Sequence, residues 1–276
     1  MKRLTRYFLK RLSYLINYPF IKPAAVTIVI TNRCNFRCQH CDVWKTKFKL
    51  KELVTDDWKS IIKDLRNWLG PFRLVISGGE PLLRSDLFDL LKFCQKQNIY
   101  TTVNTNGFLI DKDTARQLIK SGVSEIQLSL YSRGETHDNL RSIEGAYEHA
   151  EKAVKYLKEA DNQNRLKITI AVLLTAYNLK DIPDLLEWAK NNNLTIILQI
   201  LGESSVQVLG DQFAKHEPNW YKKSKLWPRD KREVKETFKI IHLYRKKGLK
   251  FVNPVNWVRA AEGYFLEPEK IKQVPC

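Results

Sequence analysis

Three cysteines in one short segment have the spacing of a metal-binding site. Cys34, Cys38 and Cys41 form a C-x3-C-x2-C triplet directly after an apolar stretch. Cysteine thiolates are the usual ligands of iron–sulfur clusters, and a cluster of four irons normally takes four of them. Three ligands would leave one iron with an open coordination position. The spacing therefore predicts a metal centre that takes part in chemistry.

A structural zinc site and a disulfide are the alternatives for these cysteines. Zinc is also held by C-x2–4-C pairs, with His as a possible fourth ligand. His40, however, lies inside the loop between Cys38 and Cys41, and the sequence has no second ligand pair at finger-like spacing. Five cysteines in 276 residues, with no secretory signal, favour a reducing cytosol over disulfides. Cys94 lies between apolar residues of a helical pattern and is interpreted as a core residue.

Apolar strand-like runs alternate with amphipathic helical patterns along most of the chain. Strands are predicted at 25–30, 73–77, 99–104, 124–130, 166–174 and 195–200, and helices near 56–69, 86–97, 112–121, 144–159 and 182–191. Thr55, Ser85 and Asp111 are helix start signals. This alternation indicates βαβ units and a parallel sheet, with right-handed crossovers. The predicted fold class is α/β, as an open, six-stranded relative of the β/α barrel.

The residues that could do chemistry follow the predicted strands. The cysteine loop comes after the first strand, Gly78–Glu80 after the second and Asn106 after the third, while Ser129 and Gln199 end the fourth and sixth. Barrel enzymes build their sites on loops at the carboxyl ends of the strands. We therefore expect these residues to meet at one mouth of the barrel.

Several of these residues suit the binding of a small charged molecule. Gly78 and Gly79 lack a Cβ, so their backbone can approach a ligand closely. Glu80 can accept hydrogen bonds from an ammonium group, and Arg141 offers a planar fork that fits a carboxylate. Taken singly, each residue also fits an ordinary turn or surface position.

These motifs together resemble the radical S-adenosylmethionine (SAM) enzymes. The triplet with His40 before its last cysteine resembles their C-x3-C-x-aromatic-C signature, and residues 77–81 (SGGEP) and 105–107 (TNG) resemble two further motifs. Ser129 and Arg141 match the serine and arginine that hold the methionine carboxylate and the ribose. The similarity covers about residues 25–202. The implied SAM-binding residues are Phe36, His40, Gly78, Gly79, Glu80, Asn106, Ser129, Arg141 and Gln199.

The resemblance implies a partial (β/α)6 barrel of the radical SAM type, with a [4Fe–4S] cluster held by the three cysteines and SAM as second cofactor. It implies reductive cleavage of SAM to a 5′-deoxyadenosyl radical that abstracts a hydrogen atom from a substrate. An electron donor such as flavodoxin or ferredoxin is the implied partner. The substrate stays open among a peptide or protein, a lipid or isoprenoid, and a nucleotide-derived molecule. Tyr131 stands where related peptide-modifying members frequently have Asp, so no role of that Asp is carried over.

Positive charge is concentrated in two segments. The chain has a net charge of +17, of which residues 1–53 carry +10 and residues 215–250 carry +9. Such a field favours an anionic partner: a membrane surface, nucleic acid or an acidic substrate. The alternatives are a basic solvated surface, or a catalytically silent metal- or RNA-binding module that uses these segments.

Three regions are expected along the chain. Residues 1–22 form a basic amphipathic helix or arm that suits either a membrane interface or docking on the barrel, with apolar residues at Leu4, Tyr7, Phe8, Leu12 and Leu15. Residues 23–228 form the core barrel. Residues 229–276 form a basic helix and a tail, with a short strand near 251–252, and resemble the start of a truncated SPASM or twitch extension in which Cys276 is the first cysteine. One cysteine predicts no auxiliary cluster. The expected location is the cytoplasm, with peripheral membrane attachment as an option, because no stretch approaches about 20 apolar residues.

Overall fold

One sheet of parallel strands organises the molecule. The computed structural model describes residues 2–45, 51–203 and 219–270. Seven strands pair in sequence order, each parallel to the next. They are β1 (Ala25–Thr31), β2 (Arg73–Gly78), β3 (Tyr100–Thr105), β4 (Glu125–Ser129), β5 (Lys167–Leu174), β6 (Thr195–Ile200) and β7 (Lys250–Phe251). The predicted α/β class and parallel sheet are confirmed. Beyond the six predicted barrel strands, β7 adds a seventh strand of two residues next to β6.

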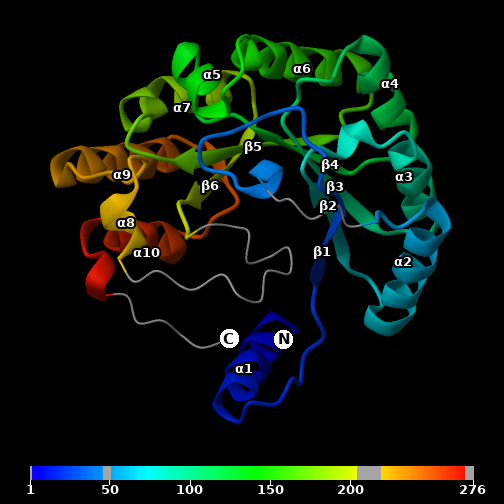
Figure 1. Cartoon of the computed structure of the whole chain (residues 1–276). Helices are drawn as coiled ribbons and strands as arrows, with labels where there is room; N and C mark the ends of the chain where they lie inside the picture. The colour runs from blue at the N-terminus through cyan, green and yellow to red at the C-terminus, as the bar shows by residue number, and fades with distance from the viewer. Residues whose placement is uncertain (1, 46–50, 204–218, 271–276) are drawn as a thin grey trace.

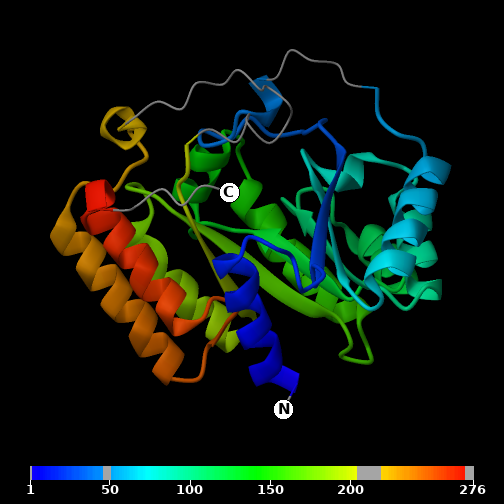
Figure 2. The same ribbon diagram turned by 90° about the horizontal axis from the view of Figure 1, so that it is seen from below.

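Helices surround one side of this sheet. Figure 1 shows them as an arc outside the strands, with α1 at the opening of the arc. They are α1 (Lys2–Leu15), α2 (Thr55–Leu69), α3 (Leu87–Lys96), α4 (Lys112–Lys120), α5 (Glu135–Arg141), α6 (Ala146–Ala160), α7 (Ile182–Asn191), α8 (Trp220–Lys223), α9 (Lys231–Lys246) and α10 (Val255–Leu266). Figure 2 shows the same opening from below, with α1 between the β1 side and α10. The sheet is therefore an open barrel, and α1 lies beside its open edge.

The helix start signals are confirmed in part. Asp111 caps α4 by accepting a hydrogen bond from the backbone N–H of Thr114 at 2.7 Å. Thr55 and Ser85 do not cap their helices: Thr55 is the first residue of α2, and its hydroxyl donates to Asp86 at 2.5 Å. The sequence pattern missed α5, because Leu140 is its one apolar residue and a helix with so few has no hydrophobic period.

Alternation along the strands separates the core from the interior of the barrel. Leu74, Ile76, Val103, Ile126 and Ile170 are fully buried in the core cluster that the helices share. Burial of such a side chain contributes about 1.5–3 kcal/mol. Their neighbours along each strand point to the opposite face. That inner face carries polar side chains, which leaves the interior of the barrel suited to a polar ligand.

A buried ionic network fills the inner face at the amino ends of the strands. Glu125, the first residue of β4, is fully buried. Its carboxylate lies 2.9 Å from Arg73 Nη2 and 3.2 Å from Lys167 Nζ, and it accepts a hydrogen bond of 2.5 Å from the Thr169 hydroxyl. A buried carboxylate is tolerated because charged and hydroxyl partners satisfy it. The remaining space in the barrel is therefore at the carboxyl ends of the strands.

Two further sequence expectations concern a membrane-spanning helix and Cys276. Among the described residues, no helix is both long and apolar enough to cross a membrane. Cys276 lies outside the described residues, so its predicted role stays a prediction.

Candidate active site

A cavity at the carboxyl ends of the strands brings the predicted residues together. Of the twelve predicted site residues, eleven line it: Cys34, Phe36, Cys38, His40, Cys41, Gly78, Gly79, Asn106, Ser129, Arg141 and Gln199. Glu80 does not. Eight further residues line the cavity, and three of them are polar strand residues that the sequence analysis did not assign to the site: Ser77, Asn104 and Gln127. Their signal was a polar residue at an alternate position of an apolar strand, which marks the inner face of the barrel.

The cysteine loop is held in place by its neighbours rather than by its own secondary structure. Phe36 is buried against Phe108, with the two ring centroids 5.4 Å apart. The backbone N–H of Gln39 donates to the carbonyl of Leu140 at 3.0 Å, at the end of α5. On the other side, the Asn106 amide donates to the Asn35 side chain at 2.8 Å. The short helix α5 and the turn after β3 thus fix the position of the loop.

The three thiols are free and largely withdrawn from water. Burial raises the pKa of Cys38 to about 11, partly opposed by the positive charge of Arg141. Burial also raises the pKa of Cys34. Metal binding requires thiolates and displaces the thiol protons, so a metal centre would offset the raised pKa of Cys34 and Cys38.

The donor set fits a cluster of four irons. Within the described ranges, no three His, Cys, Asp or Glu side chains are arranged to hold one metal ion. A four-iron cluster instead binds each cysteine to a different iron, so its ligands need not converge on one point. Three cavity-lining residues also carry buried polar atoms without a hydrogen-bond partner: His40 Nδ1, Asn104 Oδ1 and Arg141 Nε. A ligand with carboxylate and hydroxyl or amine groups would supply partners for them.

The Gly-Gly turn after β2 packs directly on the chain that enters the cysteine loop. A Cβ on Gly79 would lie 2.2 Å from the carbonyl oxygen of Arg33, and one on Gly78 would lie 2.3 Å from that of Thr31. The close approach allows two backbone hydrogen bonds of 2.8 Å, from Gly79 N–H to Thr31 and from Glu80 N–H to Arg33. Glycine is required here because any side chain would separate the two segments.

Glu80 faces the interior of the protein rather than the cavity. It is fully buried, and its carboxylate accepts hydrogen bonds from the Thr105 hydroxyl at 2.8 Å, the Asn106 N–H at 2.8 Å and the Leu82 N–H at 3.2 Å. Burial raises its pKa, while these hydrogen bonds oppose the increase. Its visible role is to hold the turn after β2 against the turn after β3, so that Gly79 and Asn106 face the same cavity.

Arg141 is the buried cation of the site. Its guanidinium carbon lies 5.1 Å from the ring centroid of Phe36 and 5.0 Å from that of Tyr131. Its Nη1 donates to the Tyr131 hydroxyl at 2.8 Å, and that hydroxyl lies 3.2 Å from His40 Nε2. Tyr131 therefore joins the arginine to the cysteine loop.

His137, behind this group, should make the stability of the cluster-free protein depend on pH. Burial, followed by the positive charge of Arg141, lowers its pKa well below the usual value. Folding thus favours neutral His137, and its contribution is complete above the unfolded pKa of about 6.5 and is lost as the pH falls below it. In urea unfolding between pH 7.5 and 5, His137→Gln should reduce the fall in stability by up to about 1.4 kcal/mol per pH unit. Identical pH profiles for the two proteins would contradict this.

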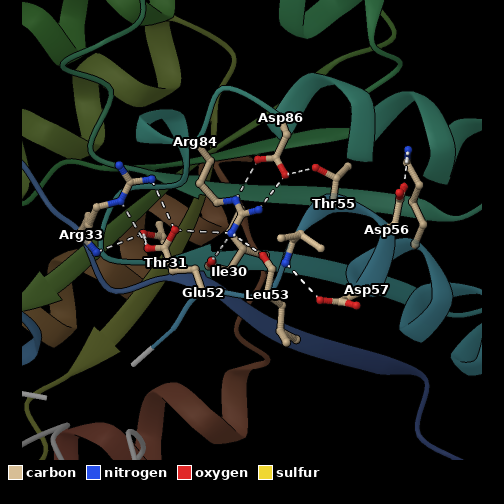
Figure 3. Close-up of polar contacts among 12 residues, drawn as sticks. Ile30, Thr31, Arg33, Glu52, Leu53, Thr55, Asp56, Asp57, Arg84 and Asp86 are labelled. Carbon is tan, nitrogen blue, oxygen red and sulfur yellow. Dashed lines mark hydrogen bonds and ion pairs between the residues drawn. The ribbon is translucent and has the colours of Figure 1, made fainter. Parts of the chain in front are cut away.

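An arginine clamp lies beside the cysteine loop, at the carboxyl end of β1 (Figure 3). Arg84 donates from Nε and Nη2 to the Asp86 carboxylate, at 2.8 and 2.6 Å, and from Nη1 to the carbonyls of Ile30 and Leu53, at 3.0 and 3.1 Å. It also lies 3.5 Å from the carboxylate of Glu52. The Arg84 side chain is 7% exposed. Its guanidinium therefore joins β1 to the segment that follows the cysteine loop at a place that is largely shielded from solvent.

Glu52 completes the clamp from the other side of the loop. Its carboxylate accepts hydrogen bonds from the Thr31 hydroxyl and from Arg33 Nε, the latter at 3.3 Å (Figure 3). Thr31 and Arg33 precede the first cysteine, whereas Glu52 follows the last. The clamp thus joins the two ends of the segment that carries all three thiols.

Loss of Arg84 should be costly for the fold. Arg84→Met leaves Asp86 without its cation, and the buried carbonyl of Ile30 and the partly buried carbonyl of Leu53 without this donor, so we expect the free energy of unfolding to fall by about 3–5 kcal/mol. Arg116, whose side chain on α4 is 57% exposed and pairs with Asp113, is the matched control. Arg116→Met should change stability by less than about 0.5 kcal/mol. Urea unfolding measures both, and equal losses would rule out a special role for Arg84.

A match to a family model shows which protein family this chain belongs to. The family model described as the radical SAM superfamily matches residues 28–189. The chain belongs to the radical SAM superfamily. Members of this family bind a [4Fe–4S] cluster and SAM. The predicted resemblance is thereby confirmed, and the match includes every predicted site residue except Gln199.

Curated relatives of this radical SAM chain include enzymes with different products. It is 32% identical over 182 residues to the Fe-coproporphyrin III synthase of Methanosarcina barkeri, covering 64% of this chain and 44% of the relative. It is 29% identical over 167 residues to a PqqA peptide cyclase of Bradyrhizobium diazoefficiens, covering 60% and 43%. The chain thus spans less than half the length of these relatives.

Solved structures of radical SAM proteins share the fold. Streptococcus suis SuiB bound to the precursor peptide SuiA aligns with a TM-score of 0.66 at 21% identity, over 91% of this chain and 52% of SuiB. The protein anSMEcpe with bound AdoMet aligns with a TM-score of 0.62 at 17% identity, over 84% and 64%. The predicted partial barrel is confirmed by these neighbours, which include proteins of the SPASM or twitch type.

Proposed function

We propose that this chain is the catalytic core of a radical SAM enzyme. The observation that carries the proposal is the convergence of three cysteine thiols, a Gly-Gly turn, Ser129 and a buried arginine on one cavity at the carboxyl ends of the strands. A catalytically silent metal- or RNA-binding module, the alternative from the sequence, finds no support among relatives that are enzymes.

Cys34, Cys38 and Cys41 would hold a [4Fe–4S] cluster. When bound, the reduced cluster and SAM supply a 5′-deoxyadenosyl radical for hydrogen abstraction. The protein contributes position and the exclusion of water. Phe36 and its neighbour Phe108 support the cysteine loop from inside, and the contacts of Gln39 and Asn106 prevent it from moving away from the barrel.

Different residues of the site would contact different parts of SAM. Arg141 would bind the methionine carboxylate with the donors that Tyr131 does not use, and Ser129 would assist from the end of β4. Gly78 and Gly79 would line the methionine end of the site. The other residues proposed to contact or support SAM are Phe36, His40, Asn106 and Gln199, with Glu80 holding Asn106 from behind.

The substrate is proposed to be a peptide or protein. SuiB and anSMEcpe are both described with bound peptides, which supports a macromolecular substrate for this fold. The porphyrin and heme synthases among the relatives show that smaller products occur in the family. A lipid, isoprenoid or nucleotide-derived substrate is the remaining option from the sequence.

The partners are proposed from chemistry and charge. One-electron reduction of the cluster needs a donor such as a flavodoxin or ferredoxin. The basic segments at residues 1–53 and 215–250 suit an anionic partner. We place the protein in the cytoplasm and propose a division into an arm (1–22), a core barrel (23–228) and a C-terminal region (229–276).

Anaerobic reconstitution with iron and sulfide tests the function. We expect about four irons per chain, and 5′-deoxyadenosine by chromatography after dithionite reduction with SAM. Arg141→Lys should keep the iron but weaken SAM binding in equilibrium dialysis at least about tenfold, because lysine cannot form the bidentate contact. Arg133→Lys, at an exposed ion pair with Asp184, is the control. Bound zinc, or a cluster that never cleaves SAM, would overturn the proposal.

A further inference from the structure

An exposed apolar stripe runs along α1. Tyr7, Phe8, Arg11, Tyr14 and Leu15 share one face, because residues three, four and seven apart lie together on a helix. The four apolar members are 59%, 65%, 74% and 76% exposed, in sequence order. We call these five residues the α1 stripe. The sequence left open whether this helix docks on the barrel, and the exposure shows that the stripe does not face it.

Further apolar side chains continue the surface beyond the helix. Ile16, Tyr18 and Phe20 are 54%, 60% and 42% exposed. Lys22 Nζ donates to the carbonyl of Trp68 at the end of α2, and the Trp68 side chain is 57% exposed. Lys22 thus joins the end of this segment to α2 beside an exposed tryptophan, and α1 lies at the open side of the helix arc in both views (Figures 1 and 2).

The charge around the stripe has one sign. Residues 1–22 contain six basic residues, and no Asp or Glu occurs before Asp42. Lys10 and Arg11 are exposed, and the Arg11 guanidinium lies 5.4 Å from the ring centroid of Tyr7. Arginine and lysine beside exposed aromatic and leucine side chains have the composition of helices that lie in the interface of anionic membranes.

We propose that α1 and residues 16–22 bind the surface of an anionic lipid bilayer. Tyr14, Leu15 and Phe8 would enter the boundary between headgroups and acyl chains, while Lys10 and Arg11 would contact lipid phosphates. Tyrosine and tryptophan favour this depth because one end of each ring system is polar. The arrangement would hold the open side of the barrel toward the membrane. It is independent of the cluster and of SAM, and so goes beyond the proposed enzymatic activity.

Vesicle flotation of the full chain tests the proposal. The protein, as purified under anaerobic conditions, is mixed with vesicles of phosphatidylcholine alone or with 30% phosphatidylglycerol, in about 0.1 M and 0.5 M salt. We expect flotation with the anionic vesicles at low salt, and at least about tenfold less with neutral vesicles or at high salt.

Two pairs of variants assign the binding to the stripe. Phe8→Ser/Leu15→Ser and Lys10→Glu/Arg11→Glu should each weaken binding to anionic vesicles at least about tenfold. The matched controls are Leu243→Ser, at an apolar residue of α9 that is 45% exposed, and Lys92→Glu/Lys96→Glu, at two exposed lysines of α3 outside both basic segments. The controls should bind as the unchanged protein does.

Three results would overturn the proposal. The first is no flotation with any vesicle, and the second is equal loss in the control variants on α3 and α9. The third is another use of the same surface: a dimer in light scattering that Phe8→Ser/Leu15→Ser dissociates, or RNA binding that Lys10→Glu/Arg11→Glu removes, with vesicle binding unaffected. Because flotation needs neither cluster nor SAM, none of these results depends on whether the protein cleaves SAM.

Discussion

Replacement of Cys38 by alanine is expected to abolish SAM cleavage without unfolding the barrel. Two thiolates would remain for the cluster that we propose this loop holds with three. Even changes to groups behind metal ligands commonly cost 10–100-fold, so we expect a loss of at least about 100-fold in 5′-deoxyadenosine formation. Iron content after reconstitution should fall well below that of the unchanged protein, while the stability of the cluster-free chain should change by only about 1 kcal/mol.

Cys94 provides the matched control for this experiment. It is fully buried on α3, in the core cluster, and burial raises its pKa to about 12. Cys94→Ala removes a thiol of the same size from a region without other cysteines, and should retain iron and SAM cleavage. Normal turnover in Cys38→Ala would contradict the cluster assignment, whereas equal iron loss in both variants would indicate a general effect on folding.

Gly79→Ala is expected to damage the site through the backbone alone. The new Cβ would meet the Arg33 carbonyl oxygen at 2.2 Å and its carbon at 2.6 Å. Since both are backbone atoms, the turn and the start of the cysteine loop must move apart, which weakens the hydrogen bonds from Gly79 to Thr31 and from Glu80 to Arg33. We expect a loss of about 3 kcal/mol in stability. Reconstituted iron and SAM affinity should both fall, measured by iron analysis and equilibrium dialysis.

Gly263 gives the opposite expectation for the same change. It lies in α10, where a Cβ would have no heavy atom within 4 Å. Gly263→Ala should therefore stabilise the protein by up to about 1 kcal/mol, as alanine does in a helix, and leave iron and SAM binding intact. If Gly79→Ala behaved like Gly263→Ala, close contact between the turn and the cysteine loop would not be needed for the site.

The sequence predicted the sheet and the cavity lining because both follow from local patterns. Apolar runs mark the strands, and the cysteine loop, Gly78 and Asn106 stand where those runs end. A parallel sheet then brings the ends together. Long-range polar contacts have no such pattern. Glu80 looked like a cavity residue by position in its motif, but Thr105 and Asn106 direct its carboxylate inward.

The clamp and the buried arginine show the same limit. Nothing in the spacing of Arg84 indicates that it binds the carbonyls of Ile30 and Leu53, 54 and 31 residues away. Arg141 was expected from its motif, but its position between two aromatic rings depends on α5, a helix without a hydrophobic period. The sequence has Tyr131 where the resemblance suggested Asp. Only the structure shows that this tyrosine contacts Arg141 and His40.

The clamp around Arg84 also has a consequence for how this part of the chain can change in length. Because Thr31 and Arg33 are fastened to Glu52, the intervening residues form a ring that the folded barrel has already closed. Doubling the length of a flexible loop costs only about 0.6 kcal/mol in closure entropy. A change in the number of residues inside this ring should therefore cost little closure entropy, as long as Trp44 keeps its place, because Trp44 lines the cavity and its Nε1 donates to the Cys38 carbonyl at 3.3 Å.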